Sequence, residues 1–497
     1  MHAIELLLAL LLLVSNARAE GNAFVFTHSM STSHLGVLFN LANKLDGFDI
    51  YDVRWPIIEA AAKYKAPERF RSKIFNRSMV LGMEMKDQMK KIGWKSSGNE
   101  FMAMMSMVAK IPQLIMMPCD FKDDIIVDRE LSTNVSLVDP FSSMCSIART
   151  RRLGVRYVFV SALIEPMTLT ALSGGDLPLS YTTSNIIAKP VEDMSFLECV
   201  LNSFAHPIFY SILIKSQLGA ARWIYGEDSA FAPIEPTFVL VNSHQFVNWP
   251  IPKTFARIDF GTRSNVARGD HKPAPIEEDL LKFMENTSFQ KIIVFSMSTF
   301  TDDGEMPEEI IEVMVEAFSD DRFKKVGFIW RINDLNEKFR RPNVKVVRWM
   351  AQRSVLEHPK TSGLISHCGQ NSFLEAVHAG IPMICIPIMG DQHLQTAKVK
   401  FFGIGTTGSK DSLTAQGVSE KLDRLLSDKR IRTKSEKLAR MIATEDSLLP
   451  DRARWWLRYF MRHSDTQLQK FVFPASSSIG ILDLSIALAA AFIVLSN

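Results

Sequence analysis

Few cysteines and little net charge limit what this sequence can be. Its 497 residues include only five cysteines, an odd number with no close pair: Cys119, Cys145, Cys199, Cys368 and Cys385. This spacing is not that of a disulfide-stapled scaffold, so no essential disulfide is expected. The formal charge of +3 gives no electrostatic reason to expect a nucleic-acid partner.

Signatures of metal and dinucleotide binding are also missing. No His/Cys cluster has the spacing of metal ligands, so no metal site is expected. No GxGxxG turn follows the first strand-like run, Ala23–Phe26, which argues against a Rossmann dehydrogenase. The sequence contains no short repeat and no low-complexity segment. What remains is a globular composition, 47% hydrophobic, in a chain too long for one core.

Two series of alternating strand-like and helix-like runs predict an α/β fold with two doubly wound, Rossmann-like domains. In the first series, residues 20–248, the apolar runs lie at 23–26, 155–160 and 238–242. In the second, residues 291–470, they lie at 292–295, 325–329, 344–347, 363–366 and 383–386. Residues 249–290, rich in Pro, Gly and charge, are predicted to be a linker.

Both ends of the chain are apolar. An apolar run before Ala17-Arg18-Ala19 predicts a signal peptide over residues 1–19, with a first buried helix as the alternative. Residues 479–497 predict a marginal C-terminal membrane anchor, because only 14 residues follow Asp483 and spanning takes about 20. The alternative is a hydrophobic helix lying in the membrane interface or packed on the protein. Sequons at Asn76, Asn134 and Asn286 are compatible with glycosylation in a lumenal compartment.

The stretch from Trp349 to Gln392 concentrates the groups that a nucleotide sugar needs. A buried strand at 363–366 leads through a small turn into a helix that Gly380 ends. Asn371 and Ser372 are good helix starters, and a helix N-terminus favours an anion such as a diphosphate. Glu375 lies one turn into this helix, where a carboxylate can accept hydrogen bonds from ribose hydroxyls.

The same stretch resembles, without a gap, the signature of the UDP-glycosyltransferases, the family that includes the UDP-glucuronosyltransferases. Trp349 and Gln352 match its WxPQ-like start, Ser366–Glu375 its [ST]HGGxNSxxE core, and Asp391-Gln392 its closing DQ. Further similarity lies around His34, at Asp139, at 294–299 and at 451–463. The resemblance implies a GT-B fold, in which an N-terminal acceptor-binding domain and a C-terminal UDP-sugar-binding domain face each other across a cleft.

The resemblance also implies roles for individual residues. His34 would be the catalytic base and Asp139 would orient it, in a single displacement that inverts the anomeric centre. The donor UDP-sugar would be the co-substrate, with no further cofactor and no metal. The implied donor-binding residues are Ser296, Thr299, Trp349, Gln352, His367, Gly369, Asn371, Ser372, Glu375, Asp391 and Gln392.

Several departures from the family pattern keep a second reading open. Cys368 replaces the first Gly of the HGG turn, Ser298 replaces the Gly of FSxGS, and a strand between Lys44 and Tyr51 is expected to be absent or shortened. The first reading is an enzyme that transfers a sugar from UDP-glucose or UDP-glucuronic acid to a small lipophilic acceptor. The second is an inactive lumenal protein that binds a ligand or partner. The expected location is the endoplasmic reticulum lumen, anchored by the C-terminal helix, or lumenal or secreted without it. A homo-oligomer stays open.

Overall fold

The computed structural model describes both predicted halves of the chain. The described residues are 22–27, 34, 36–38, 41, 50–54, 71–74, 133–140, 147, 156–164, 166–175, 183, 188–189, 193–210, 237–249, 251, 253–261, 274–297, 306–332, 341–388, 390–448 and 452–471. The predicted signal peptide and C-terminal anchor, together with Asn76, Ser298 and Thr299, lie outside this set.

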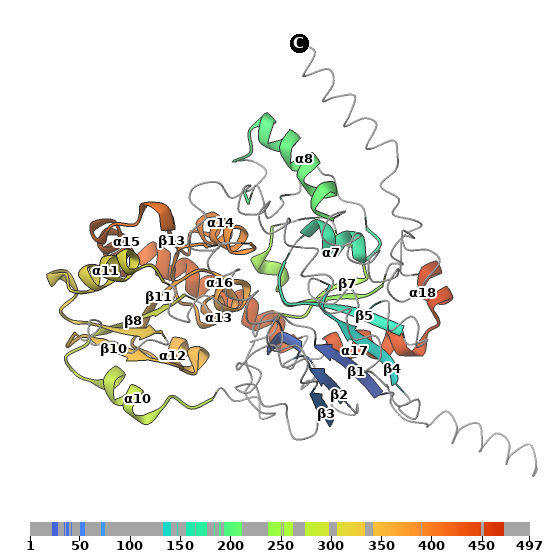
Figure 1. Ribbon diagram of the computed structural model, residues 1–497, viewed down its shortest axis with the longest axis horizontal. Helices are drawn as coiled ribbons and strands as arrows, with labels where there is room; N and C mark the ends of the chain where they lie inside the picture. Colours follow the sequence, from blue (N-terminus) through green and yellow to red (C-terminus); the bar gives the residue numbers. More distant parts are fainter. Residues whose placement is uncertain are drawn as a thin grey trace, which may run out of the picture.

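The first sheet has seven parallel strands in the order β3-β2-β1-β4-β5-β6-β7 (Figure 1). Their bounds are β1 Asn22–Thr27, β2 Ile50–Arg54, β3 Arg71–Ile74, β4 Thr133–Val138, β5 Arg156–Ser161, β6 Val239–Val241 and β7 Arg257–Asp259. The strand expected to be absent or shortened between Lys44 and Tyr51 is not absent, because β2 pairs with β1 from Ile50 onward. The sequence of β2, IYDVR, includes two charged residues and is a weaker signal than a continuous apolar run.

Helices α7 Pro166–Leu172, α17 Arg452–Arg462 and α18 Asp465–Phe471 pack against this sheet. Also in the first half are α8 Phe196–Tyr210 and the 3-10 turn η4 Gln245–Val247, whose Val247 packs with residues of the second half. Leu457 and Phe460 of α17 share one buried cluster with Val135 and Leu137 of β4. The C-terminal helices therefore complete the core of the N-terminal half.

The second sheet has six parallel strands in the order β10-β9-β8-β11-β12-β13. The strands are β8 Lys291–Ser296, β9 Val326–Arg331, β10 Val344–Val347, β11 Thr361–Ser366, β12 Met383–Cys385 and β13 Gly405–Thr407. Its helices are α10 Glu278–Glu285, α11 Glu308–Phe318, α12 Gln352–Glu357, α13 Gln370–Ala379, α14 Gln392–Phe402, α15 Ala415–Ser427 and α16 Lys429–Leu448, with 3-10 turns η6 Asp321–Phe323 and η8 Lys410–Ser412.

Alternate residues of these strands face two separate cores. Ile292 and Val294 pack with α10, α12, α13 and α16, whereas Ile293 and Phe295 pack with α11 and α15. A parallel sheet buried on both faces needs such near-continuous apolar strands, and KIIVFS of β8 supplies one. The prediction of an α/β fold with two parallel sheets is confirmed.

The structure divides the chain differently from the predicted domain bounds. Within the predicted linker 249–290, β7 is the seventh strand of the first sheet, and α10 buries Leu280 and Met284 in the second core. At the other end, α17 and most of α18 lie within the predicted second domain, 291–470, yet Leu457 and Leu468 pack on the first sheet. A three-residue strand and a returning helix leave no local pattern that reveals which sheet they join.

Among the described residues, no helix combines the length and apolarity needed to cross a membrane.

Candidate active site

The two parallel sheets each reverse strand order at one point, and the candidate residues gather there. In the first sheet β1 and β4 are neighbours, and in the second β8 and β11 are neighbours, with the chain winding outward from each pair. Ligands of open α/β sheets bind beyond the carboxyl ends of the strands at such switch points. His34 and Asp139 follow β1 and β4, while Ser296 and Ser366 end β8 and β11.

His34 and Asp139 lie in direct contact. The distance from His34 Nδ1 to Asp139 Oδ2 is 2.5 Å, although 105 positions separate them. Asp139 comes directly after β4 and its side chain is 1% exposed, whereas that of His34 is 17% exposed. His34 is in a helical segment whose Val37 and Leu38 are buried in the first core, which fixes the direction of the histidine. The contact favours the tautomer with the proton on Nδ1, leaving Nε2 as an acceptor.

Two carboxylates act on this histidine. Burial lowers the pKa of His34, but the charge and hydrogen bond of Asp139, with the charge of Asp391, outweigh burial and raise the pKa above its ordinary value. Asp391 comes from the second half, so the two halves contribute to one electrostatic site. Burial raises the pKa of Asp391, and the charge of His34 and the backbone N–H groups of Gln370 and Asp391 oppose that rise.

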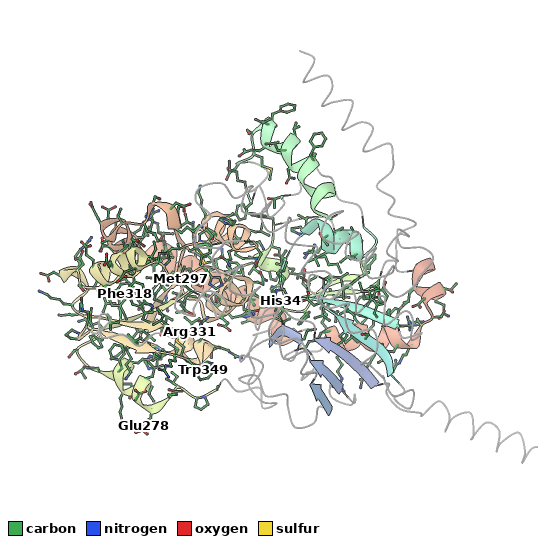
Figure 2. All side chains as sticks on the ribbon, in the orientation of Figure 1. His34, Glu278, Met297, Phe318, Arg331 and Trp349 are labelled. Carbon is green, nitrogen blue, oxygen red and sulfur yellow. A yellow bond between two sulfur atoms is a disulfide. The ribbon has the colours of Figure 1, made fainter. Side chains whose placement is uncertain are left out.

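The carboxyl end of the second sheet carries a buried cation, Arg331, which is not among the predicted site residues. Arg331 is the last residue of β9, in the second half (Figure 2). It pairs in register with Ser296, which pairs in turn with Ser366. Arg331 is 8% exposed. The sequence does offer a signal for Arg331, because it is a charged residue at the end of an apolar strand in the predicted donor domain. Its position next to Ser296 makes it a candidate for binding an anion at this edge.

His367, which senses the charge of Arg331, is neutral at pH 7. Burial and the charge of Arg331 lower the pKa of His367 to about 4, against a hydrogen bond to the backbone of Ser296. At neutral pH His367 can therefore offer hydrogen bonds but no positive charge. Its ring lies over Gly369, where an added Cβ would be 2.5 Å from His367 Nε2. A larger residue at position 369 would require the buried His367 ring to move.

The helix that follows begins one residue earlier than its predicted starters. Gly369 is the N-cap of α13 and Gln370 its first residue, so Asn371 and Ser372 lie inside the first turn. Asn242 Nδ2, after β6, donates to Asn371 Oδ1 at 2.8 Å, and Gln370 Nε2 donates to the Asn242 carbonyl at 2.6 Å. The first sheet thus contacts the N-terminus of α13.

The residues expected to hold the nucleoside also meet. Gln352 Nε2 donates to Glu375 Oε2 at 2.7 Å and lies 3.4 Å from Ser372 Oγ. Glu375 is 5% exposed, whereas Trp349 is 49% exposed, unusual for a large aromatic side chain and suited to stacking. A carboxylate, an amide and an open aromatic face are the groups that a ribose and a base require.

The loop after β12 brings the DQ pair to the same edge. Asp391 is the N-cap of α14, and Gln392 Oε1 accepts from the Ile388 N–H at 2.7 Å. Of the other predicted positions, Thr299 lies outside the described residues. Asn286 is exposed after α10, and Asn134 is the second residue of β4. No group of three or more potential metal ligands is found within the described ranges.

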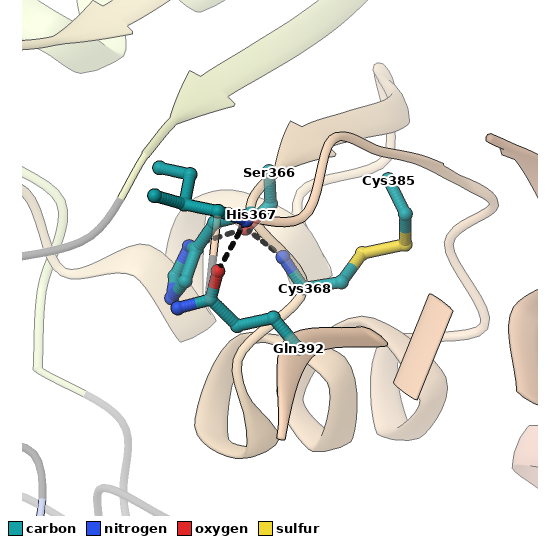
Figure 3. Close-up of a disulfide and its surroundings, with 6 residues drawn as sticks. Ser366, His367, Cys368, Cys385 and Gln392 are labelled. Carbon is teal, nitrogen blue, oxygen red and sulfur yellow. Dashed lines mark hydrogen bonds between the residues drawn. A yellow bond between two sulfur atoms is a disulfide. The ribbon is translucent and has the colours of Figure 1, made fainter. Parts of the chain in front are cut away.

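The structure corrects the expectation about disulfides. Cys368 and Cys385 are bonded to each other, with 5.4 Å between their Cα atoms (Figure 3). They are 17 positions apart in sequence, but β11 and β12 are neighbours and Cys385 pairs in register with Ser366. Sequence spacing conceals this proximity. Both side chains are fully buried, and the bond directs the side chain of Cys368 toward Cys385.

Comparison with known proteins gives a consistent result. The model of the family described as UDP-glucoronosyl and UDP-glucosyl transferase matches residues 46–473. The chain is 25% identical over 330 residues to UDP-glucuronosyltransferase 2B14 of Oryctolagus cuniculus, covering 64% of this chain and 59% of that protein. It is 27% identical over 331 residues to UDP-glucuronosyltransferase 2B7 of Homo sapiens, covering 64% and 60%. The chain thus spans less than two thirds of these relatives.

Solved structures share the fold at low identity. A UDP-glucose: anthocyanidin 3-O-glucosyltransferase in complex with UDP matches with a TM-score of 0.58 at 17% identity, over 90% of this chain and 100% of that one. The calicheamicin glycosyltransferase CalG4 matches with a TM-score of 0.58 at 14% identity, also over 90% and 100%. The predicted GT-B fold is confirmed. The family match over residues 46–473, with this fold, shows that the chain belongs to the UDP-glucuronosyl and UDP-glucosyl transferase family.

Proposed function

We propose that this protein is an active, inverting transferase that moves a hexose or hexuronic acid from a UDP-sugar to a hydroxyl of a small lipophilic acceptor. The observation that carries the proposal is the contact between His34 and Asp139, at 2.5 Å in a buried setting. His34 precedes the matched residues 46–473, so this contact supports its role independently of the family match. A partly buried His–Asp pair with a raised histidine pKa is suited to removing a proton from a hydroxyl.

The reaction follows from these groups. His34 Nε2 takes the acceptor's O–H proton while the acceptor oxygen forms a bond to C1 of the sugar. The bond from C1 to the UDP oxygen breaks, and UDP leaves with the electron pair. Asp139 stabilises the resulting imidazolium through Nδ1. Attack opposite the leaving group inverts the configuration at C1.

The second half is proposed to bind the donor. Trp349 stacks on the uracil, Gln352 and Glu375 bind the ribose, and Asp391 and Gln392 bind sugar hydroxyls. The diphosphate is proposed to lie over the turn of His367, Gly369, Asn371 and Ser372, next to Ser296 and Thr299. Arg331 then supplies the fixed positive charge there, because His367 is neutral. This charge stabilises the departing UDP.

The test is turnover of labelled UDP-glucose and UDP-glucuronic acid with a pooled set of phenol and steroid acceptors. His34→Ala and His358→Gln are compared with the wild type, because His358 ends α12 and takes no part in the proposed chemistry. Conjugate formed by the wild type and His358→Gln, but lost in His34→Ala, is expected. Binding of UDP without turnover of either donor by any acceptor would favour the inactive ligand-binding protein instead.

We also propose that the protein functions in the lumen of the endoplasmic reticulum. Disulfides persist in oxidising compartments, and the bond between Cys368 and Cys385 accords with one. The sequon at Asn286 is exposed, and its Oδ1 accepts from the Ser288 N–H at 2.9 Å. Removal of N-glycans from the expressed protein is expected to increase its gel mobility, and Asn286→Gln to reduce that change. A protein whose mobility does not change would contradict a lumenal location.

A further inference from the structure

We infer that the disulfide between Cys368 and Cys385 is a positioning device for the donor, which holds the diphosphate turn in a backbone conformation that elsewhere calls for glycine. The inference rests on the proposed donor site. The side chains of Cys368 and Cys385 are inferred to act through the backbone of the turn and not by touching the donor.

The first observation is the conformation of Cys368. Its φ is +57°, and among the described residues only Ala188 is another non-glycine with positive φ. A side chain with a Cβ disfavours this left-handed region, whereas glycine enters it freely. The UDP-glycosyltransferase signature that the sequence resembles has glycine at this position. Here the left-handed turn is kept although the glycine is not.

The second observation is what surrounds the turn. The Cys368 N–H donates to Ser366 Oγ at 3.2 Å, and Ser366 Oγ lies 3.2 Å from His367 Nδ1 (Figure 3). Gly369 then caps α13, whose first N–H groups face the proposed diphosphate position. If Cys368 left the left-handed region, these groups would change direction.

The third observation is the anchor point. Cys385 is the last residue of β12, fully buried between β11 and β13. Three residues further along, the Ile388 N–H donates to Gln392 Oε1. The disulfide therefore ties the diphosphate turn to the strand that leads into the sugar-binding loop, and it fixes both parts of the donor site relative to each other.

The two cysteines make a sharp mutational series possible. Cys385→Ala removes the bond but leaves a Cβ at position 368, so the turn relaxes and the donor must restore it on binding. Cys368→Gly with Cys385→Ala removes the same bond but lets residue 368 keep positive φ without penalty. Both variants lose whatever stability the disulfide gives. They differ only at residue 368, where the single variant keeps a buried thiol side chain and the double variant has the backbone freedom of glycine.

The experiment is calorimetric titration of each protein with UDP, using Cys199→Ala as a control for cysteine removal, since Cys199 is not in a disulfide. Cys385→Ala is expected to bind UDP about 5- to 30-fold more weakly than the wild type, the size of the left-handed penalty. The double variant is expected to recover affinity to within about threefold of the wild type. Cys385→Val replaces Cys385→Ala in both proteins should the alanine variants not fold.

The outcomes separate this inference from the proposed function. Equal UDP affinity in the wild type and Cys385→Ala, or equal loss in both disulfide-free variants, would overturn the positioning role while leaving the donor site in place. Failure of the wild type to bind UDP would overturn both. The bond itself is checked by mass spectrometry: trypsin leaves both cysteines in one peptide, residues 361–398, which is lighter by two hydrogens when they are joined.

Discussion

Replacing Asp139 with Asn tests the proposed chemistry most directly. The substitution keeps the shape of the side chain and removes its charge from a contact of 2.5 Å at a position that is 1% exposed. A hydrogen bond to a charged group contributes about 1.5–3 kcal/mol. If that interaction stabilises the imidazolium formed during transfer, kcat is expected to fall about 10- to 150-fold.

The pH dependence gives a second, independent readout. In the wild type the charge of Asp139 helps to raise the pKa of His34, so kcat/KM is expected to rise with pH until His34 loses its proton above its ordinary pKa. In Asp139→Asn the effect of burial on the pKa of His34 dominates, so this pKa falls. The pH at which kcat/KM rises then moves lower. Initial rates measured between about pH 6 and pH 9 with acceptor well below its KM follow this shift.

Stability follows the same linkage with a defined sign. Because the pKa of His34 is raised in the folded protein, the ion pair stabilises the fold fully below the unfolded value of 6.5 and loses that contribution as pH rises through the raised pKa. Asp139→Asn should remove this dependence from the melting temperature. A variant with wild-type kcat and an unshifted pH profile would refute the role of Asp139.

Four further predictions concern the donor site. Gly369→Ala places a Cβ 2.5 Å from His367 Nε2 and should raise the KM for the UDP-sugar about tenfold; an unchanged KM would contradict the tight turn. Trp349→Ala should weaken UDP binding at least about fivefold in a titration without lowering the melting temperature, because the ring is 49% exposed. Arg331→Gln should weaken UDP binding about tenfold and raise the pKa of His367 from about 4, as followed by NMR; unchanged values for both would exclude a cation at this edge. Finally, since the pKa of His367 is depressed, its neutral form stabilises the fold above pH 6.5, and up to about 3 kcal/mol is lost as pH falls toward 4; His367→Gln should flatten this part of the denaturation profile.

Continuous apolar runs made much of the second sheet predictable. The run at 344–347 coincides with β10, and those at 292–295 and 363–366 lie within β8 and β11. β8 and β11 are buried on both faces, so hydrophobicity alone marks them, whereas β10 is a partly buried edge strand. β7 and β13 have three residues each, RID and GTT, and are strands because they lie beside longer neighbours. No local property of such segments predicts that pairing.

The site shows a similar division. The resemblance to the UDP-glycosyltransferases implied that His34 and Asp139 act together, and the structure places them in contact. Arg331 and the disulfide were missed because their importance depends on register: Arg331 beside Ser296, and Ser366 beside Cys385. Register between distant strands is a tertiary property. A rule based on spacing along the sequence cannot predict this register.

The return of α17 to the first sheet has a consequence for synthesis. Leu457, Phe460 and Leu468 complete a core whose other members begin at Val37, so this core is assembled from the two ends of the chain. On the ribosome the second sheet has all its strands by Thr407, while the first still lacks its last helices. We expect the later half to acquire protease resistance first. Nascent chains stalled near residue 448 and treated with protease would show the order, and early protection of the N-terminal half would reverse it.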